Sequence, residues 1–311
     1  MKLPLLLVIV STSSSTLIPV TYDLSGAPRI DVEFGPAQMS PHVVHLGRRG
    51  YATTMTTDHA LGTNPAQVND ITVSIPTING EPIIGVRHRH LRILHYLYGP
   101  GTTQSNIGIG PGSDLLRVGG PIDFVRQSTF GGFLRLEGTE QEFINNDCLP
   151  DSSMRMQTVL TEVDSIGRIT PRVDTRISVS IGGNVIATDS VSLVGLEGCI
   201  LIIPIGLLAD IFAVLPPTGD RVGYRTVFTD CAQTRQRLPI ITLTFTAGGL
   251  RLFPEDYTRR TAQEDTCELL IGGLADWEAD QTIPFNPLLI PGINTRSTDN
   301  EIILCDSAIN L

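Results

Sequence analysis

Short apolar or alternating runs recur along the whole chain, and turn-forming residues such as Gly, Pro, Asn and Asp separate them. A run of about four to eight residues with such boundaries is typical of a β-strand. The pattern predicts strands at residues 29–34, 70–75, 132–136, 158–163, 176–181, 199–203, 238–245 and 301–305.

Helical periodicity is sparse, and the best candidates are two short segments, Ile122–Arg126 and residues 207–215. The 30 glycines and 21 prolines, together with many Val, Ile and Thr, favour short strands joined by tight turns. We therefore predict an all-β protein of two similar halves. With 311 residues, 41% of them hydrophobic and 17% charged, the chain is long and apolar enough for two domains with a large core.

The N-terminus has the layout of a cleavable secretory signal. Lys2 precedes an apolar run from Leu3 to Val10, and small hydroxyl residues follow at 11–16. We predict a signal peptide at residues 1–16, with cleavage between about Ser15 and Val20, and a secreted mature chain. The alternative is that the apolar run forms a buried N-terminal strand. No later apolar stretch is long enough to span a membrane.

The net charge of −10 makes nucleic acid an unlikely partner on physical grounds, because an acidic surface repels phosphate backbones. Lys2 is the only lysine of the chain. The five cysteines, Cys148, Cys199, Cys231, Cys267 and Cys305, include no C-x-x-C spacing, so a metal site is not indicated. In an exported chain most of them should form disulfides, and an odd number leaves one thiol over or joined to another molecule.

The segment between Cys231 and Cys267 has a distinctive order of features. A Leu-Pro-x-Ile strand begins at Leu238, a Gly248-Gly249 turn follows, and Pro254-Glu255-Asp256-Tyr257 comes next. This order and spacing resemble the pepsin-like aspartic protease family. The resemblance implies a β-hairpin stapled at its base by a Cys231–Cys267 disulfide.

Glu197-Gly198-Cys199 and the apolar run after it resemble the second active-site strand of the same family. In the family this strand ends in Asp-Thr-Gly, whereas here it ends in Pro204-Ile205-Gly206. A proline thus takes the place of a catalytic aspartate. The family's partner cysteine for Cys199 is Gly195 here, so the resemblance implies that Cys148 pairs with Cys305 and leaves Cys199 over.

The first half is similar to the family through Gly35-Pro36-Ala37-Gln38 and the strand after it. The family's spacing from Gln38 aligns His45-Leu46-Gly47 with the first Asp-Thr-Gly. Asn106-Ile107-Gly108-Ile109-Gly110 resembles the apolar-apolar-Gly segment that packs behind that loop. Residues 177–183 resemble the strand and turn that open the second lobe. Trp277 departs from the pattern, because Glu278-Ala279-Asp280 replaces the expected apolar-apolar-Gly, and no tyrosine between residues 70 and 85 matches the flap tyrosine.

The resemblance implies a bilobal fold with two β-barrel-like lobes, at residues 17–156 and 157–311, and a central cleft. Aspartic protease chemistry needs two carboxylates that share a proton. His45 and Pro204 cannot supply them, so we predict no catalytic residues. We expect Gly47 and Gly206 to allow close backbone approach in loops that are otherwise kept. The mature chain is then a non-catalytic protein that binds a peptide or protein ligand in the cleft, with no cofactor.

Two other functions stay open. One is an active aspartic endopeptidase, or another hydrolase, with a cryptic site, although the nearest displaced motif is only Asp164-Ser165-Ile166-Gly167. The other is a structural or storage protein with a collapsed cleft.

All six histidines lie between residues 42 and 95. His88, His90 and His95 could contribute ligands to a zinc site, or this basic stretch could bind an acidic partner. The interleaved arginines favour a solvated basic edge. The oligomeric state is not indicated.

Overall fold

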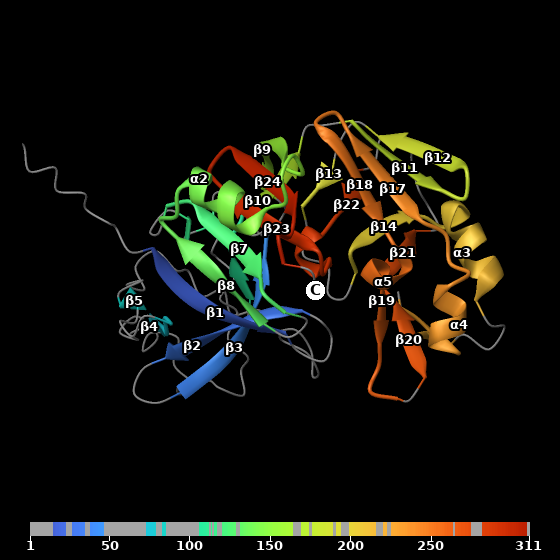
Figure 1. The fold of residues 1–311 in the computed structure, drawn as a ribbon, viewed down its shortest axis with the longest axis horizontal. Helices are drawn as coiled ribbons and strands as arrows, with labels where there is room; N and C mark the ends of the chain where they lie inside the picture. Colours follow the sequence, from blue (N-terminus) through green and yellow to red (C-terminus); the bar gives the residue numbers. More distant parts are fainter. Residues whose placement is uncertain are drawn as a thin grey trace, which may run out of the picture.

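The computed structural model describes residues 15–22, 27–34, 38–46, 73–78, 83–84, 106–111, 113, 115–116, 120–128, 131–163, 169–173, 176–188, 191–193, 199–215, 220–222, 225–263, 265–274 and 282–309. Strands dominate both halves of the chain (Figure 1). The prediction of an all-β protein is confirmed. Among these residues no helix is long and apolar enough to cross a membrane.

In its described residues the first half consists mainly of strands joined by turns, with a short helical connection before its last strand. Its strands are β1 (Thr16–Tyr22), β2 (Pro28–Phe34), β3 (Gln38–His45), β4 (Val73–Ile75), β5 (Ile83–Ile84), β6 (Asn106–Gly108), β7 (Ile122–Arg126), β8 (Gly131–Leu136) and β9 (Met154–Val163). Helix α2 (Glu140–Glu142) and a π-helical turn (Phe143–Asp147) connect β8 to β9. Thr139 caps α2, because its hydroxyl accepts from the Glu142 N–H while the Glu142 carboxylate accepts from the Thr139 N–H.

The second half has more strands and the longer helices. Its strands are β10 (Ile169–Val173), β11 (Ile177–Ile181), β12 (Asn184–Thr188), β13 (Val191–Ser192), β14 (Leu201–Pro204), β15 (Asp220–Val222), β16 (Arg225–Thr229), β17 (Ile241–Phe245), β18 (Gly248–Leu252), β19 (Thr258–Arg260), β20 (Thr266–Leu269), β21 (Ile271–Leu274), β22 (Ile283–Pro284), β23 (Ile293–Ser297) and β24 (Glu301–Asp306). Its helices are α3 (Ala209–Val214), α4 (Cys231–Arg235), α5 (Pro254–Tyr257) and the 3-10 turns Ile205–Leu208 and Pro287–Leu289.

Every predicted strand overlaps an observed one, and the predicted helix at residues 207–215 overlaps a 3-10 turn and α3. The strand predicted from residue 238 begins only at Ile241. Leu238 lies in the bend that follows α4, where its N–H donates to the Thr234 carbonyl, and Pro239 has no N–H to give to a sheet. Residues 70–72 lie outside the described part of the chain.

The predicted helix at Ile122–Arg126 is wrong, because this segment is strand β7. It pairs with β8 on one side and β23 on the other, and all five residues are buried. Two arginines from neighbouring strands form ion pairs with Asp123, so both faces of the strand can be buried.

One large sheet joins the two halves of the chain. Its 14 strands follow the order β22-β13-β10-β9-β24-β23-β7-β8-β1-β2-β3-β6, with β4 paired to β2 and β5 paired to β4. The C-terminal strands β23 and β24 therefore return to the first half and lie between β7 and β9 (Figure 1). The predicted lobe boundary at residue 156 falls within β9 and stays a prediction.

Three smaller sheets make up the rest of the second half: β12-β11-β17-β18, β15-β16-β20-β19 and the parallel pair β14-β21. The predicted turn after β11 is confirmed, with Gly182 at φ 56° and Gly183 at φ 93°, where L-residues are strained. The predicted Gly248-Gly249 turn is wrong, because both glycines begin β18 and the turn residues are Thr246 and Ala247. One apolar core runs through both halves.

Both predicted disulfides are present, Cys148–Cys305 and Cys231–Cys267. The second one joins the first residue of α4 to β20, which belongs to a different sheet from the β17–β18 hairpin, so it does not staple the base of that hairpin. Cys199 belongs to neither bond and is only 4% exposed. A disulfide between two copies through Cys199 would therefore require this buried thiol to become accessible.

Strand β1 limits where a signal peptide can be cleaved. Residues 16 to 21 pair with β8, and Ile18 and Val20 are 1% and 2% exposed in the core. Cleavage as late as Val20 would remove this strand. We expect the secreted chain to begin at or before Leu17, as the predicted signal peptide at residues 1–16 requires, which mass spectrometry of the intact mature protein measures. A mature chain that begins after Val20 would contradict this placement of β1.

Candidate functional site

The strand that resembles the second active-site strand of the family is β14, and Pro204 is its last residue. β14 pairs in parallel with β21, and Pro204 lies opposite Leu274. Leu201 and Ile203 point into the core and are 0% exposed, whereas Pro204 is half-buried. The chain then turns into a 3-10 turn whose first residue, Ile205, is 41% exposed.

The first half contains a matching arrangement in which β3 ends at His45. β3 pairs in parallel with β6, and His45 lies opposite Gly108. Leu46, directly after the strand, is 1% exposed in the apolar core. The side chain of His45 and all of Gly47 lie outside the described part of the structure. Each predicted loop thus follows a strand, β3 or β14, that pairs in parallel with a strand containing glycine, β6 or β21.

The segment predicted to pack behind the first loop does so at Gly110. A Cβ on Gly110 would lie 1.4 Å from the carbonyl oxygen of Leu46, so only glycine fits this approach. Gly206 differs, because a Cβ there would meet nothing within 4 Å. The expectation that Gly206 is needed for close backbone approach is therefore wrong.

The parallel partner of β14 was missed at the sequence level. The sequence pattern predicts the apolar-apolar-Gly segment at Trp277, which lies outside the described residues. The structure instead pairs β14 with Ile271–Leu274, where Ile202 and Ile203 lie opposite Gly272 and Gly273. Leu270-Ile271-Gly272 carries the apolar-apolar-Gly signal a few residues upstream of where it was expected.

No Asp or Glu occurs in the sequences of the four strands that frame the two loops, β3, β6, β14 and β21. Carboxylates that influence one another do occur elsewhere. Asp123 and Asp147 both contact Arg135, with N–O distances of 3.4 and 2.8 Å. Here an arginine lies between the two carboxyl groups, which is a different arrangement from a dyad whose carboxyl groups share one proton directly.

A second pair of carboxyl groups lies on α5 and β24. Burial raises the pKa of Asp256, the N–H of Phe253 opposes this by donating to the Asp256 carboxylate, and the charges of Glu255 and then Asp306 raise the pKa further. Burial alone accounts for the raised pKa of Asp306. Asp256 therefore serves its own helix, because its carboxylate accepts from the N–H of Phe253, the residue before α5.

The described residues contain no group of three or more His, Cys, Asp or Glu side chains that could hold a metal ion. His42 and His45 lie on β3, but the described part of the structure does not include their side chains. His59, His88, His90 and His95 lie outside it altogether. The predicted basic edge around His88 and His90 thus stays a prediction.

Comparison with known proteins identifies the fold. No protein-family model matches this chain, and no curated protein matches its sequence. The crystal structure of Basic 7S globulin from soybean matches with a TM-score of 0.59 and 11% sequence identity, over 94% of this chain and 96% of that one. The aspartic proteinase from Irpex lacteus matches with a TM-score of 0.58 and 14% identity, over 95% of this chain and 98% of that one.

This chain therefore has the bilobal, all-β fold of pepsin-like aspartic proteinases. At these identities the likeness concerns the fold. The chemistry has to be argued from the residues at the two loops.

Proposed function

We propose that this protein is a secreted, non-catalytic member of the pepsin-like fold that binds an extended peptide or protein segment between its lobes. The observation that carries the proposal is the residue set of the loop strands. Neither β3 nor β14, nor the strands parallel to them, contains a carboxylate, and Pro204 stands where the resemblance places a catalytic aspartate.

Peptide hydrolysis by this fold depends on two carboxylates with one shared proton, one acting as base toward water and the other as acid toward the substrate. Proline offers no titratable group. An imidazole at position 45 is a base near neutral pH, but it has no opposing carboxylic acid in this arrangement. Binding does not need that chemistry, because an extended segment can pair its backbone with strands and seat its side chains without being cut.

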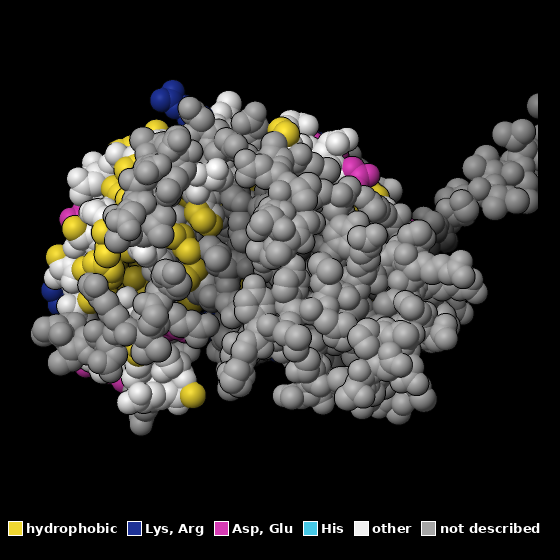
Figure 2. All heavy atoms as spheres, turned by 180° about the vertical axis from the view of Figure 1, so that it is seen from behind, with side chains coloured by type: hydrophobic (Ala, Val, Ile, Leu, Met, Phe, Trp, Pro, Cys, Tyr) yellow, Lys and Arg dark blue, Asp and Glu magenta, His cyan; other side chains and the backbone are white. Residues whose placement is uncertain are grey.

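The second loop presents an apolar surface to a ligand. Ile205 is 41% exposed beside the half-buried Pro204, so an apolar side chain is available to a ligand at this loop. Figure 2 shows hydrophobic side chains gathered over this half of the molecule on the reverse face. Both disulfides support export, since such bonds persist in oxidising compartments.

The two structural neighbours are consistent with either class of function. One is, by its name, an aspartic proteinase, and the other is, by its name, a globulin. The fold is therefore compatible with both a hydrolase and a non-catalytic protein, and the residues of the two loops support the second.

The proposal predicts which exposed isoleucine a ligand contacts. We expect Ile205→Asp to weaken binding of extended apolar peptides at least about tenfold, because it puts a charge against an apolar ligand. The measurement is the retention of a synthetic peptide library by the purified chain, with bound peptides identified by mass spectrometry.

The matched control is Ile240→Asp, since Ile240 is 43% exposed but lies just before β17, outside the two loops. Binding that falls equally in both variants would contradict the placement of the site. Recovery of cleaved rather than intact peptides would contradict the non-catalytic function.

A further inference from the structure

The carboxylate of Asp210 lies against the turn of the β11–β12 hairpin. The side-chain amide of Asn184, the first residue of β12, donates to Oδ2 of Asp210 at 3.0 Å. A Cβ on the turn residue Gly182 would lie 2.2 Å from the same oxygen, so any other residue there would displace the carboxylate. Figure 1 shows this hairpin next to α3, whose second residue is Asp210. One side chain thus joins the hairpin to the helix.

Asp210 is the only charged residue between Cys199 and Leu215, the segment that contains the second loop and α3. Its side chain is half-buried, and the asparagine that donates to it lies 26 residues earlier in the chain. A charged group that is partly removed from water needs a polar partner. The hairpin supplies this partner, so the contact ties the segment of the second loop to β12.

The same segment carries Ile205, the exposed side chain of the second loop. Leu207 and Leu208 of the 3-10 turn are buried in the apolar core, which fixes how deeply the turn sits. Apolar contacts have no preferred direction, whereas a hydrogen bond does. The Asp210 contact is therefore suited to fix the orientation of the turn, and with it the direction of Ile205.

The turn packs closely on β21. A Cβ on Gly273 would lie 3.2 Å from Cγ1 of Ile205 and 3.0 Å from Cδ1 of Leu208, so there is little free space between the strand and the turn. A small rotation of the turn would therefore change how Ile205 faces a ligand.

We propose that Asp210 is a positioning residue of the candidate ligand site, where it holds the turn in the orientation that presents Ile205. The inference rests on the proposed function, because it concerns binding at Ile205. A site that already has its binding conformation loses little further conformational entropy when the ligand arrives, which raises its affinity. The ligand it suits is an uncharged, apolar peptide segment, since residues 204–209 carry no charge and the hairpin engages Asp210.

The test is the affinity of the full mature chain for the peptide that it retains most strongly from a synthetic library. We expect Asn184→Asp to weaken this binding about tenfold, because a second carboxylate then faces that of Asp210 and the turn is released. Exchanging the two side chains, as Asn184→Asp together with Asp210→Asn, should restore the affinity to within about twofold, because an amide again faces a carboxylate.

The matched control is Ala187→Asp, which adds the same charge at an exposed position of the same strand and should leave the affinity unchanged. A second readout is hydrogen exchange at the amides of Leu207 and Leu208. It should become faster in Asn184→Asp and slow again in the exchanged variant.

Equal affinity of Asn184→Asp and the unchanged chain would overturn the positioning role and leave the proposed function intact. An exchanged variant that recovers its stability in urea but not its affinity would overturn it as well, because the contact would then be only structural. An unchanged chain that retains no peptide would contradict the proposed function itself, and this inference with it.

Discussion

Gly110→Ala is expected to destabilise the first half by more than about 4 kcal/mol, enough to prevent a stable fold. The reason is steric, since the added Cβ would lie 1.4 Å from the Leu46 carbonyl oxygen and 2.5 Å from its carbonyl carbon. Backbone atoms cannot rotate away as a flexible side chain can, so either β3 or the segment after β6 has to move. Soluble yield and the urea unfolding curve of the purified variant measure the effect.

Gly206→Ala is the control, because Gly206 lies in the loop after β14, the counterpart of β3, and has open space around it. Its backbone is not in the left-handed region. We expect this variant to fold and to gain up to about 1 kcal/mol through the reduced entropy of the unfolded chain. Equal behaviour of the two variants would show that Gly110 does not touch the loop after β3.

Removing the Cys148–Cys305 disulfide, as the double serine variant, is expected to lower the free energy of unfolding by about 5 kcal/mol. The bond closes a loop with a sequence separation of 157 residues, which removes more entropy from the unfolded chain than a short loop does. It also joins the end of the first half to β24, a strand in the middle of the large sheet. Urea unfolding of both forms measures the difference.

The matched control is the double serine variant of Cys231 and Cys267, whose sequence separation is 36 residues. The same entropy relation gives about 4 kcal/mol for this shorter loop. The informative result is which of the two double serine variants loses more free energy of unfolding. A larger loss on removing the shorter bond would show that the C-terminal strands hold their place without the longer one.

Sequence reasoning worked where the signal was local. Alternating or apolar runs bounded by turn residues predicted the strands, and β11 shows why: its residues alternate between 0% exposed isoleucine and valine and half-buried serine. The two disulfides could be predicted only through the family resemblance, since five cysteines alone allow many pairings.

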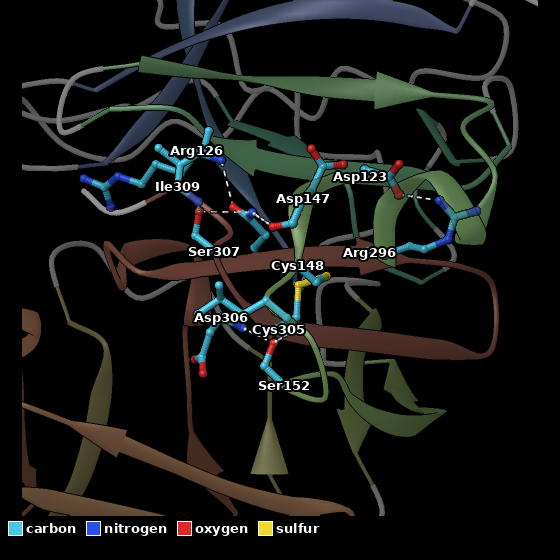
Figure 3. The surroundings of a disulfide bond; sticks show 12 residues. Asp123, Arg126, Asp147, Cys148, Ser152, Arg296, Cys305, Asp306, Ser307 and Ile309 are labelled. Carbon is cyan, nitrogen blue, oxygen red and sulfur yellow. Dashed lines mark hydrogen bonds and ion pairs between the residues drawn. A yellow bond between two sulfur atoms is a disulfide. The ribbon is translucent and has the colours of Figure 1, made fainter. Parts of the chain in front are cut away.

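The errors have non-local causes. Ile122–Arg126 is predicted as a helix but forms strand β7, where arginines of the neighbouring strands β8 and β23 form ion pairs with the buried Asp123; Figure 3 shows the pair with Arg296. Leu238 and Pro239 were assigned to a strand because the hydrogen bond that ends α4 is not visible in the apolar pattern. Such partners are distant in sequence or depend on backbone geometry, so the pattern of apolar and polar residues does not predict them.

The candidate site was only partly accessible from sequence. The alignment of Pro204 with a catalytic position came from the motif, and the structure adds that β14 and β3 each end beside a parallel strand. The different needs for glycine at positions 110 and 206 could not be predicted, because both occur in glycine-containing motifs. Only the distance to a neighbouring backbone separates a required glycine from a dispensable one.

The most direct test of the central claim is a hydrolysis assay on the purified mature chain. Denatured protein and extended peptides are incubated with it from about pH 2.5 to about pH 7.5, with and without a transition-state-mimic inhibitor of aspartic proteases. The loop strands without carboxylates predict no cleavage at any pH, with intact peptides recovered from the complex. Cleavage that the inhibitor abolishes would contradict this account and would require a pair of catalytic carboxylates outside β3 and β14.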